Sequence, residues 1–181
     1  MMTENFEPLF KLDEYQREAK HKSVFYQQDI LSVNQFTKED MDYLFQRADE
    51  MLAMCRRWGT CDLLKDYTLA CVFYEPSTRT SSSFISAMVR LGGRVIPITE
   101  GIQYSSVSKG ESLIDSMLTL EQYCDLIVLR HPEIGSSATA AKYVKVPIIN
   151  AGDGAGEHPT QALLDLYTIK SELGTLDGLK V

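Results

Sequence analysis

The chain has 181 residues, which is enough for one domain of ordinary size with a full hydrophobic core. Its 18 basic and 25 acidic side chains give a formal net charge of −7, which argues against general affinity for nucleic acid or anionic membranes. Hydrophobic residues make up 44% of the chain, but they form no run long enough to span a bilayer. Any site for an anion must therefore be local.

The cysteines and histidines are scattered along the chain and have no metal-ligand spacing. No Cys-x-x-Cys pair occurs, and the first residues lack the basic-then-apolar pattern of a signal peptide. We therefore expect an intracellular, cytoplasmic protein without a metal site. Buried core thiols are expected at Cys71 and Cys124, which lie in or beside apolar runs.

Residues 1–23 are charged and show no sustained apolar period, so they are interpreted as a linker or N-terminal arm. The pattern changes at Thr37, which forms a potential capping box with Asp40. Apolar residues then recur at helical spacing as far as Gly59, where the helix is expected to end.

Four short apolar, β-branched or aromatic runs follow and are typical of strands, at 69–74, 94–98, 126–130 and 147–150. Segments of helical character separate or follow them, at 81–91, 111–123, 136–143 and 159–173. Strands that alternate with helices favour right-handed crossovers between parallel strands. The predicted fold class is a three-layer α/β/α domain with a four-stranded parallel sheet.

Residues 77–83 follow the first predicted strand and carry six hydroxyl side chains around Arg79. The start of a helix offers free N–H groups and a positive dipole end, and the guanidinium adds a bidentate donor. This turn suits a phosphate, although it has no Walker pattern. Helix capping alone also explains a run of Ser and Thr at this place.

Other strand ends carry further candidates. Arg130 closes the third predicted strand, while His158 and Gln161 lie at the start of the last helix after a glycine-rich loop. These side chains could bind a phosphate and stabilise an oxyanion. The plain alternatives are an ordinary strand-end arginine, a helix-capping histidine and a glutamine that faces solvent. Lys109 lies in a serine-rich loop at 105–112, where a lysine is ordinarily a solvated charge.

The segment Phe73-Tyr74-Glu75-Pro76-Ser77-Thr78-Arg79-Thr80 resembles the Ser-Thr-Arg-Thr carbamoyl-phosphate signature of the aspartate and ornithine carbamoyltransferases. The other motifs occur in the order of that family: Ser-Val-Ser-Lys-Gly-Glu-Ser at 106–112, Arg-His-Pro at 130–132, Asn-Ala-Gly-Asp-Gly at 150–154 and Gly-Glu-His-Pro-Thr-Gln at 156–161. The resemblance covers about residues 24–181. It is closest to the aspartate carbamoyltransferase domain of animal multifunctional pyrimidine-synthesis proteins.

The resemblance implies a role for each matching residue. The phosphate of carbamoyl phosphate would be bound by Ser77, Thr78, Arg79, Thr80 and Arg130. The carbamoyl oxygen would contact Thr80, Arg130 and His158, and Gln161 would hold the amino group. Of these, Arg79, Thr80, Arg130 and His158 are the expected catalytic residues. Lys109 and Ser105 would act on the substrates of a neighbouring subunit.

By the same resemblance, the activity is transfer of the carbamoyl group to L-aspartate in pyrimidine (UMP) biosynthesis, with phosphate as the second product and without a cofactor. A homotrimer is implied, as is fusion to other pyrimidine-pathway domains. The expected organisation is a carbamoyl-phosphate-binding domain at 24–181 without the aspartate-binding domain that follows in the family. The chain alone is therefore expected to be inactive.

Two alternatives remain open at this point. The phosphate motif is shared with ornithine-type carbamoyltransferases. A carbamoyl-phosphate-binding or assembly domain without catalytic activity would also retain it.

Overall fold

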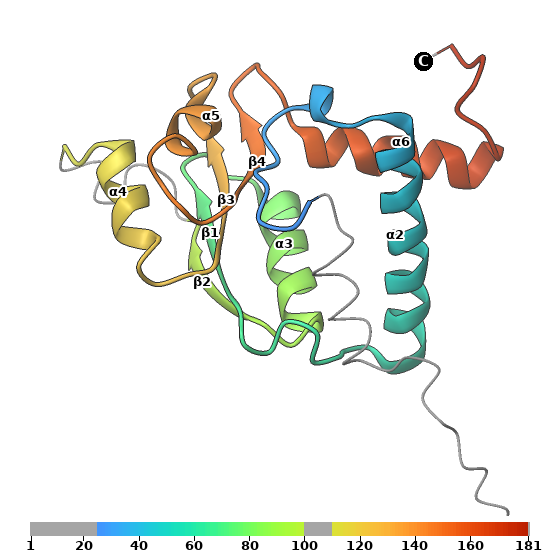
Figure 1. Ribbon diagram of the computed structural model, residues 1–181, viewed down its shortest axis with the longest axis horizontal. Coiled ribbons are helices and arrows are strands. Elements are labelled where there is room, and N and C mark those ends of the chain that lie inside the picture. Colours follow the sequence, from blue (N-terminus) through green and yellow to red (C-terminus); the bar gives the residue numbers. More distant parts are fainter. Residues whose placement is uncertain (1–24, 100–109, 181) are drawn as a thin grey trace, which may run out of the picture.

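A parallel sheet of four strands forms the centre of the computed structural model, which describes residues 25–99 and 110–180 (Figure 1). The strands lie in the order β2-β1-β3-β4. Their bounds are Thr68–Phe73 for β1, Arg94–Ile98 for β2, Leu126–His131 for β3 and Ile148–Asp153 for β4. The four-stranded parallel sheet expected from the sequence is confirmed.

The chain reverses its direction of travel across the sheet between β1 and β3. From β1 it crosses to β2 on one side, and it then returns to place β3 on the other side of β1. Phe73, the last residue of β1, pairs with Arg130 of β3. Ligands of open parallel sheets bind beyond the carboxyl ends of the strands at such a switch point. The topology therefore directs attention to the loops that follow β1 and β3.

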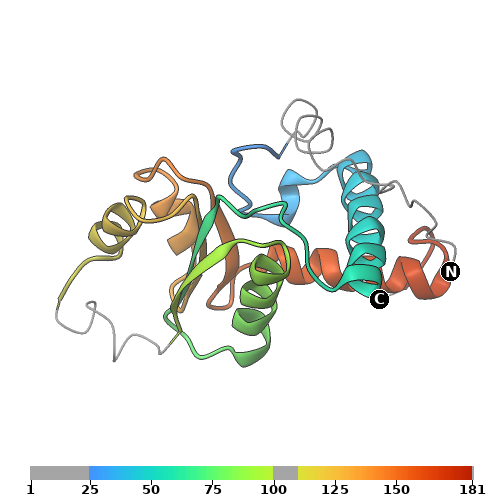
Figure 2. The ribbon, with the colours of Figure 1, turned by 90° about the horizontal axis from the view of Figure 1, so that it is seen from below.

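Helices cover both faces of the sheet, as Figures 1 and 2 show. Alternate residues of a strand point to opposite faces. Ala70 and Val72 of β1 pack on the side of α4 (Leu113–Leu120) and α5 (Ser136–Ala140). Leu69, Cys71 and Phe73 pack on the side of α3 (Thr78–Arg90), together with Met88 of that helix. All of these strand side chains are buried, so the sheet separates two apolar cores.

The remaining α-helices, α2 (Lys38–Trp58) and α6 (Pro159–Leu173), pack against each other on the α3 side (Figures 1 and 2). α6 begins beside β4 and runs outward to α2, which lies away from the sheet. The Tyr167 hydroxyl donates to Asp49 Oδ1 at 2.6 Å, and Lys170 Nζ lies 2.5 Å from Asp42 Oδ1. Phe45 lies beneath Lys170 in a cation–π arrangement. These contacts connect the first long helix to the last one.

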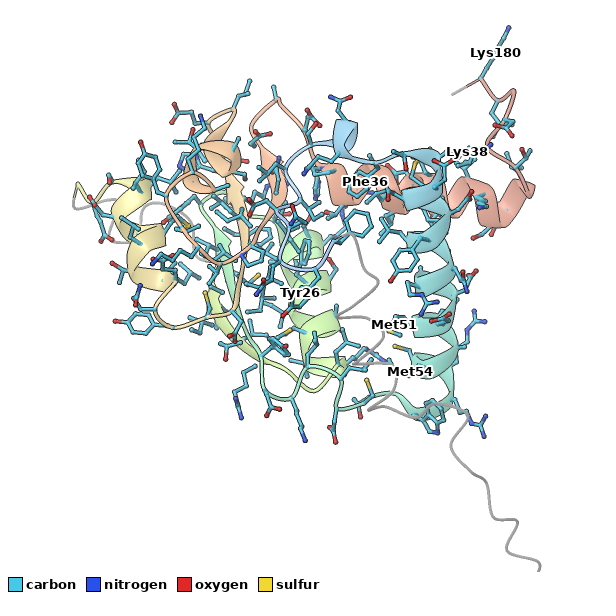
Figure 3. The ribbon with its side chains drawn as sticks, viewed as in Figure 1. Tyr26, Phe36, Lys38, Met51, Met54 and Lys180 are labelled. Carbon is cyan, nitrogen blue, oxygen red and sulfur yellow. The ribbon has the colours of Figure 1, made fainter. Side chains whose placement is uncertain are left out.

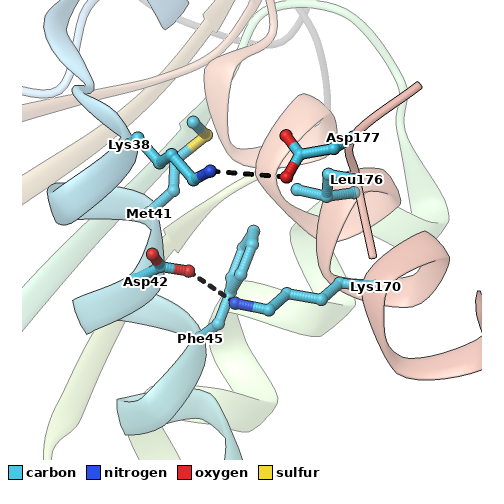
Figure 4. A pocket seen from close by; sticks show the side chains of 7 residues that line it. All are labelled: Lys38, Met41, Asp42, Phe45, Lys170, Leu176 and Asp177. Atoms are coloured by element: carbon cyan, nitrogen blue, oxygen red, sulfur yellow. Dashed lines mark hydrogen bonds and ion pairs between the residues drawn. The ribbon is translucent and has the colours of Figure 1, made fainter. Parts of the chain in front are cut away.

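Figure 4 shows a small hollow where α2 meets α6 and the residues after it, lined by Lys38, Met41, Asp42, Phe45, Lys170, Leu176 and Asp177. Its charged side chains are paired with each other, Lys38 with Asp177 and Lys170 with Asp42. Met51 and Met54 project further along α2, on the side that faces the rest of the chain (Figure 3). The hollow is thus part of the helix–helix contact.

Residues 29–31 run along the outer edge of β4. Ile30 donates its N–H to the Ile148 carbonyl and accepts the N–H of Asn150, both at 2.8 Å, which forms a parallel bridge to Ile149. A short 3-10 helix, η1 (Val33–Gln35), follows directly. This early segment therefore behaves as a fragment of a fifth strand.

Several element bounds differ from the prediction. α3 begins at Thr78 rather than Ser81, because Ser81 and Ser83 donate their hydroxyls to carbonyls of the preceding turn and so fit inside a helix. β4 continues to Asp153, although residues 151–153 were expected in a loop. α4 and α5 are shorter than the predicted 111–123 and 136–143, and β1 and β3 each shift or extend by one residue. Within the described ranges, no helix is both long and apolar enough to cross a membrane.

Candidate anion-binding site

The turn between β1 and α3 presents hydroxyl side chains at a helix N-terminus. Ser77 occupies the N-cap position, but its side chain makes no capping hydrogen bond within the described part of the chain. Ser81 instead donates its hydroxyl to the Ser77 carbonyl at 2.7 Å. Ser81 and Ser83 thus donate their hydroxyls to backbone carbonyls of the preceding turn. Ser77, Thr78 and Thr80 do not use their hydroxyls in this way. The capping explanation therefore does not account for Ser77, and first-turn N–H groups remain available for an anion.

Arg79 is the second residue of α3, and its side chain is exposed. Among residues 25–99 and 110–180, its guanidinium has no hydrogen bond or ion pair. It lies at the positive end of the helix dipole, where a cation gains nothing from the helix and an anion is stabilised. An exposed arginine at this place is suited to bind an incoming anion.

Arg130 is held at the adjacent strand end by contacts on two sides. Its Nη1 donates to the Ala151 carbonyl of β4 at 3.0 Å, and its Nε lies 3.5 Å from Glu75 Oε2, just after β1. The Nε is buried and has no hydrogen bond to any described residue. A guanidinium carries five N–H donors, so donors remain for a ligand after these contacts. Arg130 is therefore oriented before any ligand binds.

Glu75 and Gly152 are two parts of this arrangement that the sequence did not predict. Glu75 pairs with Arg130, while Gly152 gives its guanidinium room to lie against β4. Glu75 belongs to the hydroxyl-rich motif and Gly152 to the glycine-rich one, so both residues lie in motifs that the sequence marks as candidate sites. A signal for their roles was lacking, because the contacts join Arg130 of β3 to the turn after β1 and to β4.

His158 is the N-cap residue of α6, as its place after the glycine-rich loop predicted. Its ring makes no capping hydrogen bond to any residue that the structure describes. Burial, followed by the positive charge of Arg130, lowers the pKa of His158 below its ordinary value, and Asp165 opposes this in part. The imidazole is therefore neutral near pH 7 and can donate one hydrogen bond to a developing oxyanion. The effect of the Arg130 charge on this pKa places the end of β3 and the start of α6 near one another.

Gln161 is exposed and lies in the first turn of α6. Its Nε2 donates to Asp165 Oδ1 at 2.9 Å, one turn further along the helix. The structure thus directs this amide along α6, and binding a ligand would require it to exchange Asp165 for the new partner. Ser105 and Lys109, the remaining predicted site residues, lie outside the described residues.

His131 is buried directly after Arg130 and supports the strand end. Its Nδ1 accepts the N–H of Glu133 at 3.1 Å and lies 2.8 Å from the hydroxyl of Ser136. Its ring contacts Tyr74 edge-on, with 5.3 Å between the ring centroids. In the described ranges, no three or more His, Cys, Asp or Glu side chains gather as a metal-binding group.

A family model described as "Aspartate/ornithine carbamoyltransferase, carbamoyl-P binding domain" matches residues 28–171. The chain belongs to this family. As a carbamoyl-P binding domain, it has the fold class and the family membership that the motifs predicted, and both are confirmed.

Several relatives of this carbamoyl-P binding domain are aspartate carbamoyltransferases. It is 54% identical over 153 residues to the aspartate carbamoyltransferase catalytic subunit of Leptospira biflexa, covering 84% of this chain and 49% of the relative. It is also 54% identical over 157 residues to the multifunctional protein CAD of Squalus acanthias, covering 87% of this chain and 7% of the relative. The chain thus spans about half the length of the catalytic subunit.

A solved structure of aspartate transcarbamoylase from Trypanosoma cruzi, in complex with carbamoyl phosphate and aspartate, superimposes with a TM-score of 0.79 at 43% identity. The match covers 84% of this chain and 50% of that one. Because these relatives bear the aspartate name, the ornithine alternative is not favoured.

Proposed function

We propose that this domain binds carbamoyl phosphate and supplies the donor half of an aspartate carbamoyltransferase active site. The observation that carries the proposal is the position of two arginines at one switch point. Arg79 lies in the first turn of α3 after β1, and Arg130 is the penultimate residue of the neighbouring β3, near His158. Paired guanidiniums and a helix N-terminus are suited to a phosphate dianion. The Trypanosoma cruzi relative, solved with carbamoyl phosphate, supports this choice of ligand.

In the proposed reaction, the amino group of L-aspartate attacks the carbonyl carbon of carbamoyl phosphate. A tetrahedral oxyanion forms, the C–O bond to phosphate breaks, and the amine loses a proton as N-carbamoyl-L-aspartate is released. Thr80, Arg130 and the neutral His158 would stabilise the oxyanion, while Arg79 and the start of α3 would stabilise the leaving phosphate. Gln161 would hold the carbamoyl amino group. Catalysis would then consist of positioning and electrostatic stabilisation, without a nucleophilic side chain.

The proposal extends to parts of the enzyme beyond this domain. Residues 24–181 would form the donor domain, and the residues that bind L-aspartate would belong to a second domain. The full enzyme would be a cytoplasmic homotrimer of the pyrimidine pathway, in which Lys109 and Ser105 act on the neighbouring subunit's substrates. The names of the multifunctional relatives support fusion to further domains. Sedimentation of the chain at several concentrations tests the trimer.

Calorimetric titration of the chain with carbamoyl phosphate and with inorganic phosphate tests the central claim. We expect saturable binding of both anions at one site per chain, with phosphate competing against carbamoyl phosphate. Turnover with carbamoyl phosphate and L-aspartate should be close to zero. Absence of binding would contradict the proposed function, whereas robust turnover would contradict the need for a second domain.

A further inference from the structure

Glu157 precedes His158 directly, and its carboxylate connects the α6 loop to the early segment along β4. Oε2 accepts the backbone N–H of Val33 at 2.7 Å, and Oε1 accepts the Ser32 hydroxyl at 3.0 Å. These partners lie more than a hundred positions away in the sequence, at the start of η1. A carboxylate with both oxygens bound by neighbouring donors is held in a single orientation.

The backbone of Glu157 is fixed as well. Its N–H donates to Asp153 Oδ1 at 2.7 Å, and its carbonyl accepts from Asn150 Nδ2 at 3.3 Å. Both partners are buried residues of β4, at 6% and 1% exposed. Asp153 also accepts the N–H of Gly135, the N-cap residue of α5, at 2.8 Å. Every polar group of Glu157 is therefore bound, so the residue before His158 has little freedom to move.

The segment to which the carboxylate is attached is itself anchored. Ile30 is bonded to β4 on both of its polar backbone groups, and Asn150 Nδ2 donates to the Leu31 carbonyl at 3.1 Å. Gln35 Oε1 accepts the N–H groups of Leu31 and Ser32 at 2.6 and 2.9 Å. The contact of Glu157 with Ser32 and Val33 therefore connects the loop before α6 to a segment that is itself hydrogen-bonded to the sheet.

We propose that Glu157 is a positioning residue: by bridging to Ser32 and Val33, it fixes the His158 ring relative to Arg130 and so increases affinity for the anion. The inference rests on the proposed function for the identity of its ligand. The hydrogen bonds from which it is argued do not depend on that function. Glu157 has no role in the chemistry itself. It acts through His158, because its side chain points to η1 and its backbone leads into the N-cap of α6.

A positioning role and the negative charge of Glu157 have opposite effects on affinity for the anion. A carboxylate beside an anion site repels the anion, so its neutralisation should strengthen binding by Coulomb's law. If Glu157 positions His158, neutralisation should weaken binding instead. Glu157→Gln is nearly isosteric and removes the charge, but its amide nitrogen would face a donor. Ser32→Ala removes one bond of the same bridge and leaves the charge in place.

Calorimetry with inorganic phosphate and carbamoyl phosphate distinguishes the positioning role from the effect of the charge. We expect affinity to fall about tenfold in Glu157→Gln and about threefold in Ser32→Ala, which corresponds to roughly one lost hydrogen bond in each case. Combining both changes should cost little more than Glu157→Gln alone, because they break one bridge. Glu133→Gln is the matched control, since it neutralises an exposed carboxylate on the neighbouring loop after β3. Its affinity should stay within about twofold or rise.

An NMR titration of the His158 ring gives a readout that requires no ligand. Release of the loop should expose the ring and raise the pKa of His158 toward its ordinary value, because burial is the main cause of its lowering. Loss of the negative charge alone would lower it further. Thermal unfolding verifies that each variant is folded, and Ser32→Ala supplies the comparison if Glu157→Gln does not fold.

Unchanged or tighter anion binding in Glu157→Gln and Ser32→Ala would overturn the inference. So would an unchanged or lowered pKa of His158 in both variants. If the unaltered chain binds neither anion, the proposed function fails, and the ring titration still decides whether Glu157 positions His158.

Discussion

A Cβ atom on Gly152 would lie 2.6 Å from Nη1 of Arg130, closer than the Cβ atoms of real residues come to a neighbouring heavy atom. Gly152 also has a φ of +114°, which residues with a side chain rarely adopt. The same nitrogen of Arg130 donates to the carbonyl of the preceding residue, Ala151. The absence of a side chain at this position of β4 thus lets the guanidinium lie against the strand.

Gly152→Ala should therefore displace Arg130 as well as strain the backbone. We expect the free energy of unfolding to fall by about 1–3 kcal/mol and phosphate affinity to fall with it. Gly174→Ala is the matched control, because Gly174 has a φ of +76° but nothing within 4 Å of its Cβ position. It should lose stability without losing phosphate affinity. Denaturant unfolding and calorimetry measure the two effects, and equal affinity loss in both variants would contradict this role of Gly152.

Arg79→Ala should abolish measurable phosphate binding, since hydrogen bonds to charged groups contribute about 1.5–3 kcal/mol each. Arg90→Ala provides the control, because Arg90 ends the same helix and donates to the Gly59 carbonyl at 3.2 Å, far along α3 from the site. It removes the same charge from the same helix and should leave affinity nearly unchanged. Calorimetry at constant ionic strength compares them. Unchanged affinity in Arg79→Ala would rule out the assignment of the site.

Stability should rise with pH in the window just below about 6.5, the ordinary pKa of histidine, and level off above it. Burial lowers the pKa of both His131 and His158, so the unfolded chain binds more protons than the folded one in this window. Asp40 and Asp42, whose pKa values are lowered by Thr37 and Lys170, contribute only at more acid pH. Urea unfolding at several pH values measures the slope, which should be smaller in His158→Asn. A free energy of unfolding that falls across this window would refute the prediction.

Cys71 should resist alkylation in the folded chain. Its side chain is fully buried in β1, and burial raises the pKa of its thiol to about 11. The thiolate is the reactive form, so few molecules react at pH 8. Cys55 and Cys61 are only partly buried and should be labelled first. Mass spectrometry after brief iodoacetamide treatment tests this, with labelling in urea as the control. Equal labelling of Cys71 and Cys61 under native conditions would show that the strand opens.

Helix bounds could be predicted where local chemistry determines them. α2 begins directly after Thr37, which forms the predicted capping box with Asp40, and it is capped by Gly59 at its end. α6 has its predicted bounds, because Pro159 suits the first turn and Gly174 adopts the left-handed conformation that ends a helix. Each of these signals depends on residues within four positions of one another.

Features that depend on distant contacts could not be predicted. The extension of β4 to Asp153 pairs that residue with His131 of β3 past an irregularity in register, a contact between two strands that lie far apart in the sequence. The ion pair of Glu75 and the bridge from Glu157 to Ser32 likewise join segments that no periodicity relates. The predicted site residues were chosen by their places after strands. Arg79 and His158 do lie at the starts of the helices that follow β1 and β4, because these parallel strands end at one edge. The hydrogen bond from Gln161 to Asp165 depends on the side-chain conformation, which the spacing of residues in the sequence does not reveal.

The short pairing of Ile30 with β4 also affects how the chain behaves toward copies of itself. A strand at the border of a sheet offers unpaired N–H and C=O groups, which are a template for addition of another chain. Ile30 occupies the outward-facing groups of Ile148 and Asn150. A chain shortened past this residue would keep its sheet but present a bare apolar border, so self-association through β4 would compete with folding.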